Sequence, residues 1–92
     1  MSGIRFAPGS VVATPGALAA FRASGDAPLP YLMRHLAGDW GEIDPEDEIV
    51  NELSLQRGFR LLSSYRLSGG GTVWCITEAD RSVTTFLLPE EY

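Results

Sequence analysis

The chain has 92 residues, which is enough for one small domain over residues 1–92, with residues 1–9 predicted to be poorly ordered. Hydrophobic residues make up 45% and charged residues 21%, which is typical of folded domains and excludes a disordered tail or a fibre. Acids outnumber bases 12 to 7, for a net charge of −5, so we expect no direct binding of a nucleic-acid backbone, which requires clustered bases.

Three helices are predicted before residue 59, and each is delimited by cap residues. Their predicted limits are Thr14 to Gly25, the turn 26–30 to Gly38, and Asp44 to Gly58. Thr and Asp are good N-caps, proline at the first helical position loses no hydrogen bond, and glycine is the usual residue beyond a helix end. The apolar residues predicted to form the buried faces are Leu18 and Phe21, then Leu29, Leu32, Met33 and Leu36, then Ile49, Val50 and Leu53.

After Gly58 the apolar pattern changes to the alternation of a strand. The predicted strands are 59–67, with Phe59, Leu61, Tyr65 and Leu67 on one side, 72–77 and 83–88. The run 72–77 is apolar on both faces, which predicts the central strand, with Trp74 and Cys75 in the core. A further strand at 9–13 is expected at an edge of the sheet, and 83–88 is expected to be an exposed edge available to a dimer.

This order of elements predicts an α+β fold. Two to three short helices pack on one face of a three- or four-stranded antiparallel sheet that ends in a C-terminal meander.

The residue inventory excludes several kinds of site. There is no lysine, so a P-loop and Schiff-base chemistry are excluded. With only Cys75 and His35, the chain lacks the ligands for a structural zinc site, and we expect no metal and no cofactor. No apolar run approaches the roughly 20 residues of a membrane span, and the first residues do not resemble a signal peptide, so we expect a cytoplasmic protein without membrane contact.

The segment 39–52 carries seven acids and no base. These acids are Asp39, Glu42, Asp44, Glu46, Asp47, Glu48 and Glu52. One interpretation is a solvated helix face whose early acids suit the helix dipole. A second is a surface that docks a basic protein patch, and a third is a divalent-cation site, although the spacing is not that of an EF-hand.

Two loops hold the other polar residues of functional interest, 35–42 and 78–82. Trp40 is interpreted either as a lid folded back on the core or as an aromatic contact for a partner. Asp80 and Arg81 are interpreted as ordinary hairpin residues or as part of a docking surface.

A catalytic interpretation of the same loops is a small ribonuclease. In it Glu78 is the general base, His35 the general acid and Arg81 the phosphate clamp. The competing structural interpretation makes His35 a half-buried histidine beside an apolar helix face and pairs Arg81 with an acid of segment 39–52.

Several segments occur together: 12–18 (VATPGAL), Arg34-His35, 38–42 (GDWGE), 58–65, 76–82 (ITEADRS) and Glu91-Tyr92. Together, over roughly residues 10–92, they resemble a family of small bacterial proteins found on plasmids and integrated elements. Its members are commonly auto-named "plasmid-related protein" or "type I restriction endonuclease subunit M". The resemblance implies no established activity, and 92 residues are too few for the doubly wound sheet of a methyltransferase.

The sequence therefore predicts a small acidic, non-enzymatic binding protein of a mobile genetic element that docks a protein partner. A more specific hypothesis is an anti-defence inhibitor that occupies a nucleic-acid groove of a restriction or CRISPR enzyme. The residues predicted to dock the partner are Asp39, Trp40, Glu42, Glu46, Asp47, Glu48, Asp80 and Arg81. The alternative is the small ribonuclease or a toxin-like enzyme, and the sequence assigns no oligomeric state.

Overall fold

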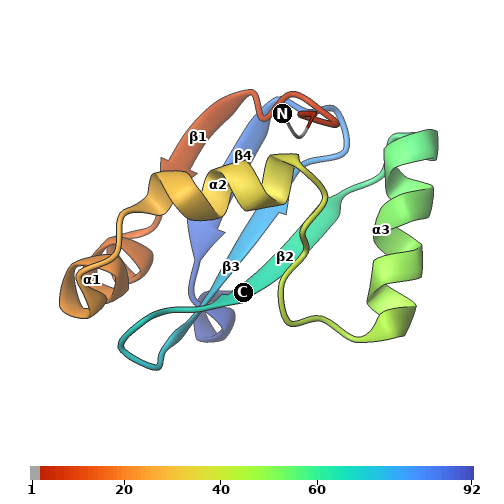
Figure 1. Cartoon of the computed structure of the whole chain (residues 1–92). Helices are drawn as coiled ribbons and strands as arrows, with labels where there is room; N and C mark the ends of the chain where they lie inside the picture. Colours follow the sequence, from red (N-terminus) through yellow and green to blue (C-terminus); the bar gives the residue numbers. More distant parts are fainter. Residues whose placement is uncertain (1–2) are drawn as a thin grey trace.

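The computed structural model describes residues 3–92, and within them three α-helices precede most of a four-stranded sheet (Figure 1). In chain order the elements are β1 (Ser10–Ala13), α1 (Pro15–Ser24), α2 (Pro28–Leu36), α3 (Pro45–Arg57), β2 (Leu61–Arg66), β3 (Thr72–Thr77), β4 (Val83–Leu87) and the 3-10 helix η1 (Pro89–Glu91). This arrangement confirms the predicted α+β class and the C-terminal meander.

The sheet has the strand order β1-β4-β3-β2. The pairs β2–β3 and β3–β4 are antiparallel as predicted, but β1 pairs in parallel with β4, so the sheet is mixed. A parallel pair needs a long connection, which the helical segment between β1 and the meander provides. The prediction of an exposed edge at 83–88 is wrong, because β1 covers that side of β4, and the edges are β1 and β2.

Local cap signals correctly predicted where the helices lie. The Thr14 Oγ1 accepts a hydrogen bond from the Ala17 N–H at 3.1 Å at the start of α1. Gly25 and Gly58 adopt the left-handed conformation beyond α1 and α3, with φ of 70° and 75°. Asp44 takes the N-cap position of α3, but its side chain makes no capping hydrogen bond.

The main core lies between the sheet and the helices α1 and α2. Its buried members are Ala17, Phe21, Tyr65, Leu67, Val73, Cys75 and Phe86. Phe21 and the predicted core residue Cys75 are therefore in place, whereas Leu18 is 44% exposed because Ala17 faces the sheet instead. Trp74 is only half-buried; the Tyr92 ring packs against it, with ring centroids 5.6 Å apart.

The helix α2 buries a different face from the one predicted. Leu29 is 62% and Met33 45% exposed, whereas His35 and Leu36 are buried. The helix crosses the sheet so that its polar His35 meets hydroxyl groups of the strands, which a purely apolar pattern does not reveal (Figure 1).

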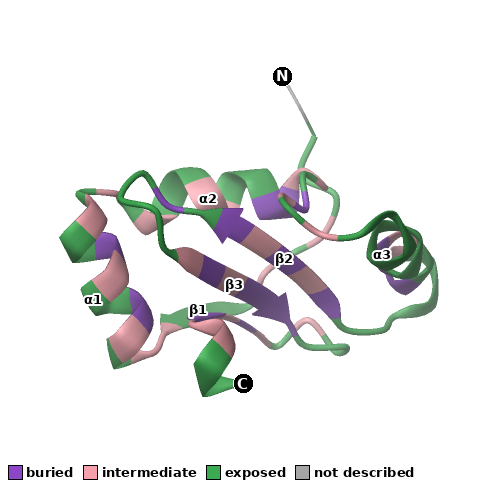
Figure 2. Cartoon of the chain, turned by 90° about the horizontal axis from the view of Figure 1, so that it is seen from below, coloured by how far each residue is buried: buried purple, intermediate pink, exposed green. Residues whose placement is uncertain are grey.

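The helix α3 lies beside the outer edge of β2 and does not cover a sheet face (Figure 2). Its buried residues are Asn51 and Ser54, and the predicted buried stripe is exposed. The exposed fractions are 63% for Ile49, 56% for Val50 and 43% for Leu53. This prediction was wrong because a strand edge offers backbone polar groups, and a helix docked there turns polar side chains inward.

Residues 3–9, part of the segment predicted to be poorly ordered, are attached to the domain; residues 1–2 lie outside the described residues. The Arg5 N–H donates to the Leu36 carbonyl at 2.8 Å, and the Pro8 carbonyl accepts a hydrogen bond from the Thr84 hydroxyl.

Phe59 lies between α3 and β2. It was predicted to begin a strand and to lie on the buried side of that strand, but it precedes β2 and is 56% exposed.

Candidate functional site

Side-chain hydrogen bonds fasten α3 to the edge of β2. The Asn51 Nδ2 donates to the Leu62 carbonyl at 2.7 Å, and the Leu62 N–H donates to the Asn51 Oδ1 at 3.1 Å. Asn51 is only 3% exposed, so its amide takes the place of a neighbouring strand. Two residues further along β2, Ser64 pairs with the backbone of Trp40 and Glu42. The outer edge of β2 is therefore occupied at both positions.

Arg81 fastens the far end of α3. Its guanidinium donates to four backbone carbonyls, those of Ser54, Phe59, Glu78 and Ala79, at 2.8 to 3.1 Å. Ser54 lies in the last turn of α3, where carbonyl groups lack helical partners, so a cation there is favourable. Hydrogen bonds from the Ser82 side chain, and secondly from the Ser82 N–H, lower the pKa of the neighbouring Asp80 carboxyl. These contacts give Arg81 a role in holding the fold.

His35 is completely buried, and both of its ring nitrogens lie within hydrogen-bond distance of side-chain hydroxyl groups. Its Nδ1 lies 2.6 Å from the Ser63 Oγ, and its Nε2 lies 2.9 Å from the Thr77 Oγ1. The Thr77 hydroxyl in turn lies 2.6 Å from that of Thr84, which donates to the Pro8 carbonyl.

The carbonyl of Pro8 fixes the direction of these hydrogen bonds, because a carbonyl only accepts hydrogen bonds. Thr84 has one proton and gives it to Pro8, so Thr77 donates to Thr84 and the His35 Nε2–H donates to Thr77. Ser63 then donates to the His35 Nδ1. The network therefore fits neutral His35 protonated on Nε2. Burial lowers the pKa of His35 to about 4, with a smaller contribution from the charge of Arg81.

The ribonuclease hypothesis requires His35, Glu78 and Arg81 to face a common substrate. His35 has no solvent-exposed surface, and the Phe6 ring packs against both His35 and the Arg81 guanidinium, at 5.2 and 5.7 Å. Glu78 is exposed on the turn after β3, and the interaction between it and Arg81 uses the Glu78 backbone carbonyl. The structure thus does not gather these three side chains around an open cleft.

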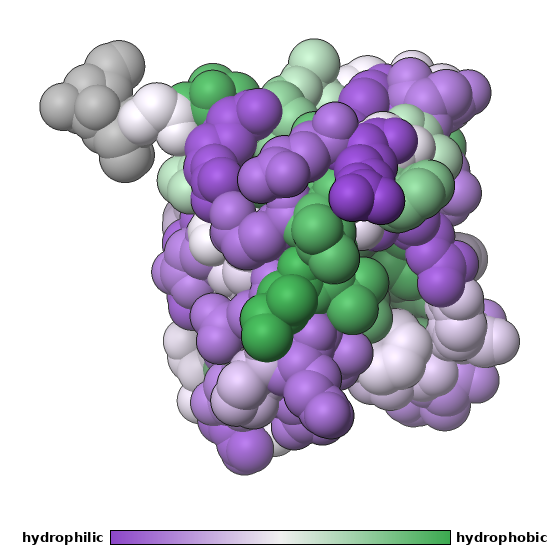
Figure 3. Space-filling view, turned by 90° about the vertical axis from the view of Figure 1, so that its right-hand side faces the viewer, coloured by the Kyte–Doolittle hydropathy of each residue, from purple (hydrophilic) through white to green (hydrophobic). Residues whose placement is uncertain are grey.

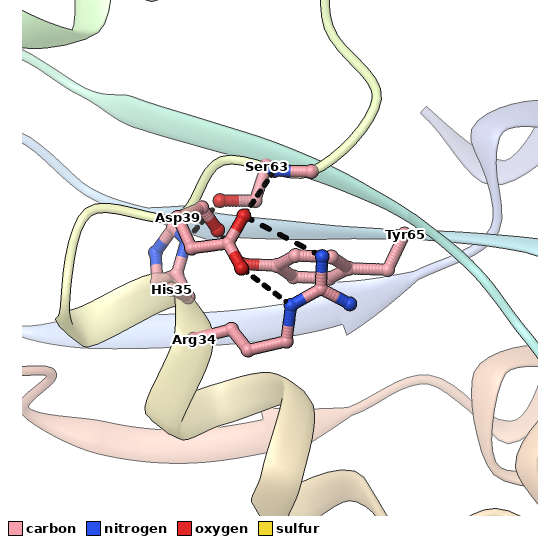
Figure 4. A network of polar contacts seen from close by, with 6 residues as sticks. Arg34, His35, Asp39, Ser63 and Tyr65 are labelled. Carbon is pink, nitrogen blue, oxygen red and sulfur yellow. Dashed lines mark hydrogen bonds and ion pairs between the residues drawn. The ribbon is translucent and has the colours of Figure 1, made fainter.

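The predicted docking residue Asp39 belongs to a network at the end of α2 (Figure 4). Arg34 holds its carboxylate through two hydrogen bonds, at 2.7 and 3.4 Å, and stacks 4.6 Å from the Tyr65 ring centroid. The Tyr65 hydroxyl donates to the Asp39 carbonyl, and the Gly41 N–H donates to the Asp39 carboxylate. The hydrogen bonds from Arg34 are the main cause that lowers the pKa of Asp39. Asp39 therefore anchors the loop into β2.

Trp40 follows in the same loop and folds back on the domain, as the lid interpretation predicts. It is only 3% exposed and stacks on Phe6 at 6.2 Å. Its Nε1–H donates to the Glu52 carboxylate, which also forms an ion pair with Arg5 at 2.8 Å. Hydrogen bonds from Arg5 are the main cause of the lowered pKa of Glu52.

The apolar side chains of α3 that were predicted to be buried are exposed instead, and they form one patch on the surface. Figure 3 shows the side of the molecule occupied by α3, where apolar side chains gather among hydrophilic ones. Beside them lies a groove of about 510 Å³. Its lining residues are Gly38, Trp40, Pro45, Glu48, Ile49, Glu52, Leu53 and Gln56. A sequence signal that could have identified this exposed face is the pair Asn51 and Ser54, polar residues three positions apart that are buried on the opposite side of the helix.

A second, acidic hollow of about 270 Å³ lies on the other side of α3, over the sheet face that α2 does not cover. It is lined by Glu42, Ile43, Asp44, Asp47, Leu62, Ser64 and Trp74. Among the described residues, Glu42 has one ion pair, with Arg66 at 3.5 Å, and Asp44 and Asp47 have none. The hollow therefore combines free carboxylates with the half-buried indole of Trp74.

The other predicted docking acids, Glu46 and Glu48, are exposed in the first turn of α3. The structure thus brings Glu42 and Asp47 together, separates them from Asp80 and Arg81, and adds Asp44 and Trp74.

Over residues 3–92, no three His, Cys, Asp or Glu side chains are placed to hold a metal ion. No helix in that range is long and apolar enough to cross a membrane. Searches against protein-family models, curated proteins and solved structures returned no match.

Proposed function

We propose that this chain is a non-enzymatic binding protein that docks a basic patch of another protein into the acidic hollow beside α3. The observation that carries the proposal is the combination of Glu42, Asp44 and Asp47 with the half-buried Trp74 ring. An arginine or lysine side chain fits such a site, because its apolar stem packs on the indole while its charge meets the carboxylates.

Electrostatics support a protein partner over a nucleic acid. The chain carries a net charge of −5, so a phosphate backbone is repelled and a positively charged protein surface is attracted. Association with such a partner is steered by charge and weakens as salt concentration rises.

The partner that fits the resemblance to plasmid-borne proteins is a host defence enzyme whose basic groove holds nucleic acid. The acidic hollow and the nearby Glu46 and Glu48 would occupy that groove in place of phosphates. The domain would then act as an anti-defence inhibitor of a restriction or CRISPR enzyme, as an accessory product of a mobile genetic element in the cytoplasm.

The small ribonuclease is the weaker candidate. Its proposed general acid, His35, is buried and bonded to Ser63 and Thr77, and its proposed clamp, Arg81, is engaged with four carbonyls. Both groups would have to leave these partners before they met a substrate.

A charge-matched capture experiment tests the docking proposal. The tagged wild-type chain and the variants D44N/D47N and E78Q/E90Q are used to capture proteins from a host lysate, with quantification by mass spectrometry. Both variants remove two negative charges, but only D44N/D47N alters the hollow. We expect a basic, nucleic-acid-binding protein to be captured by the wild type and by E78Q/E90Q, to be lost from D44N/D47N, and to be released by salt.

Equal capture by both variants would contradict the proposal, because the charges of Asp44 and Asp47 would then contribute nothing specific to binding. An RNA-cleavage assay with the purified wild-type chain tests the alternative. Cleavage that disappears in H35Q and E78Q, while the folded state persists, would favour the ribonuclease.

A further inference from the structure

The outward face of α3 carries an ordered pattern of charge and apolar groups. Glu46, Ile49, Leu53 and Arg57 follow one another at spacings of three, four and four residues, which places them along one side of a helix. The acidic residue lies in the first turn, the basic residue in the last turn, and the apolar pair between them. Ile49 and Leu53 are 63% and 43% exposed.

We infer that this face pairs with the same face of a second copy of the chain, with the two α3 helices antiparallel about a two-fold axis. In an antiparallel pair the acidic start of one helix lies beside the basic end of the other. Ile49 then packs against Leu53 of the partner subunit, and Glu46 lies beside Arg57 of the partner subunit. By symmetry each contact forms twice, as in other isologous interfaces.

The charge order along α3 selects this arrangement. A parallel pair would bring Glu46, Asp47 and Glu48 of two chains together, which is repulsive, and would align the two helix dipoles. The antiparallel pair replaces that repulsion by two opposite-charge contacts and sets the dipoles in opposite directions. The spacing of the face is also that of the helix-packing seams in which apolar side chains of one helix fill the gaps of another.

Geometry around α3 favours a helix as the occupant. An extended peptide would need free backbone groups to extend the sheet, but the edge of β2 is already occupied by Asn51 and by residues 40–42. The groove of about 510 Å³ beside Ile49 and Leu53, with Trp40 and Pro45 in its lining, gives room for the apolar side chains of the second helix.

This interface is separate from the acidic hollow. Asp44 and Asp47 line the hollow, whereas Ile49 and Leu53 line the groove on the other side of α3. Both proposals use Glu46, but the inference rests on Ile49 and Leu53, which are not part of the hollow. The D44N/D47N and L53D variants therefore distinguish failure of one proposal from failure of the other.

Sedimentation velocity over a wide protein concentration range tests the inference on the full chain. The wild type is expected to shift from monomer to dimer as concentration rises. L53D is expected to stay monomeric over the same range, because it buries a charge in the centre of the pair. L29D is the matched control: Leu29 is 62% exposed on α2, away from the interface, and its variant is expected to dimerise like the wild type.

Charge reversal tests the antiparallel register. E46R and R57E each place like charges together and should weaken dimerisation about tenfold, whereas E46R/R57E restores opposite charges in reversed order and should return most of the affinity. Circular dichroism confirms that each variant is folded. A wild-type chain that is monomeric at every concentration overturns the inference, as does loss of the dimer in L29D or a double variant no better than the singles.

Discussion

Replacement of Asn51 tests whether α3 is held by its amide rather than by apolar packing. In N51A the Leu62 N–H and carbonyl both lose their hydrogen bonds to the Asn51 amide, which are 3.1 and 2.7 Å long. Each lost hydrogen bond costs about 1 kcal/mol, and a buried group left without a partner costs roughly 1–3 kcal/mol. Leu62 is only half-buried, so water can partly replace the amide, and we expect the free energy of unfolding to fall by about 2 kcal/mol.

Urea unfolding followed by circular dichroism measures this change. For a domain of this size a loss of about 2 kcal/mol corresponds to a melting temperature lower by roughly 8–16 °C. Amide hydrogen exchange adds a local measurement, because the Leu62 N–H should exchange much faster in N51A while the amides of β3 remain protected.

N51D and Q56A provide the controls. N51D keeps an acceptor for the Leu62 N–H, but it buries a charge and sets its second carboxylate oxygen against the Leu62 carbonyl, so it should lose at least as much stability as N51A. Gln56 is exposed on the same helix, and Q56A should change the free energy of unfolding by less than about 0.5 kcal/mol. A loss in N51A no larger than that of Q56A would refute the reasoning, because α3 would then be held by other contacts.

Two further predictions concern pH and a glycine. The pKa of His35 falls from an ordinary 6.5 to about 4 on folding, so the unfolded chain binds more protons between those values. The free energy of unfolding should therefore be nearly constant between about pH 7 and 8, and fall by about 3 kcal/mol on acidification to pH 4. Urea titrations should show a smaller fall in H35Q, and an equal fall would assign the effect to carboxylates instead. Separately, G41A should lose at least about 2 kcal/mol, because the residue has φ of 74° and an added Cβ would clash with the Ser64 carbonyl. In the control G70A the backbone is strained but the space is open, so a loss of about 1 kcal/mol is expected; equal losses would contradict the clash.

Most secondary-structure positions were predictable because their signals are local. Thr14 accepts a hydrogen bond from within its own helix, and the glycines that end α1 and α3 adopt a backbone conformation that other residues avoid. The alternation in residues 61–67 likewise reports a strand with one buried face.

The candidate site was only partly predictable. The acidic segment 39–52 was visible in the sequence, but which of its acids form ion pairs was not. Asp39 is paired with Arg34, whereas Asp44 and Asp47 have no ion pair among the described residues. Trp74 was predicted to lie in the core, and its half-buried place in the hollow depends on the sheet face that α2 leaves open.

The sequence by itself determined the order of the helices and strands, their approximate limits and the α+β class, because capping, turn and periodicity signals act between residues close in the chain. Only the tertiary structure decided which side of α3 faces inward and where β1 pairs. Those choices depend on contacts such as Asn51 with Leu62 and Arg81 with Ser54, between groups that an apolar pattern does not relate. A helix beside a strand edge is held by hydrogen bonds, so its apolar residues are left for another surface to cover.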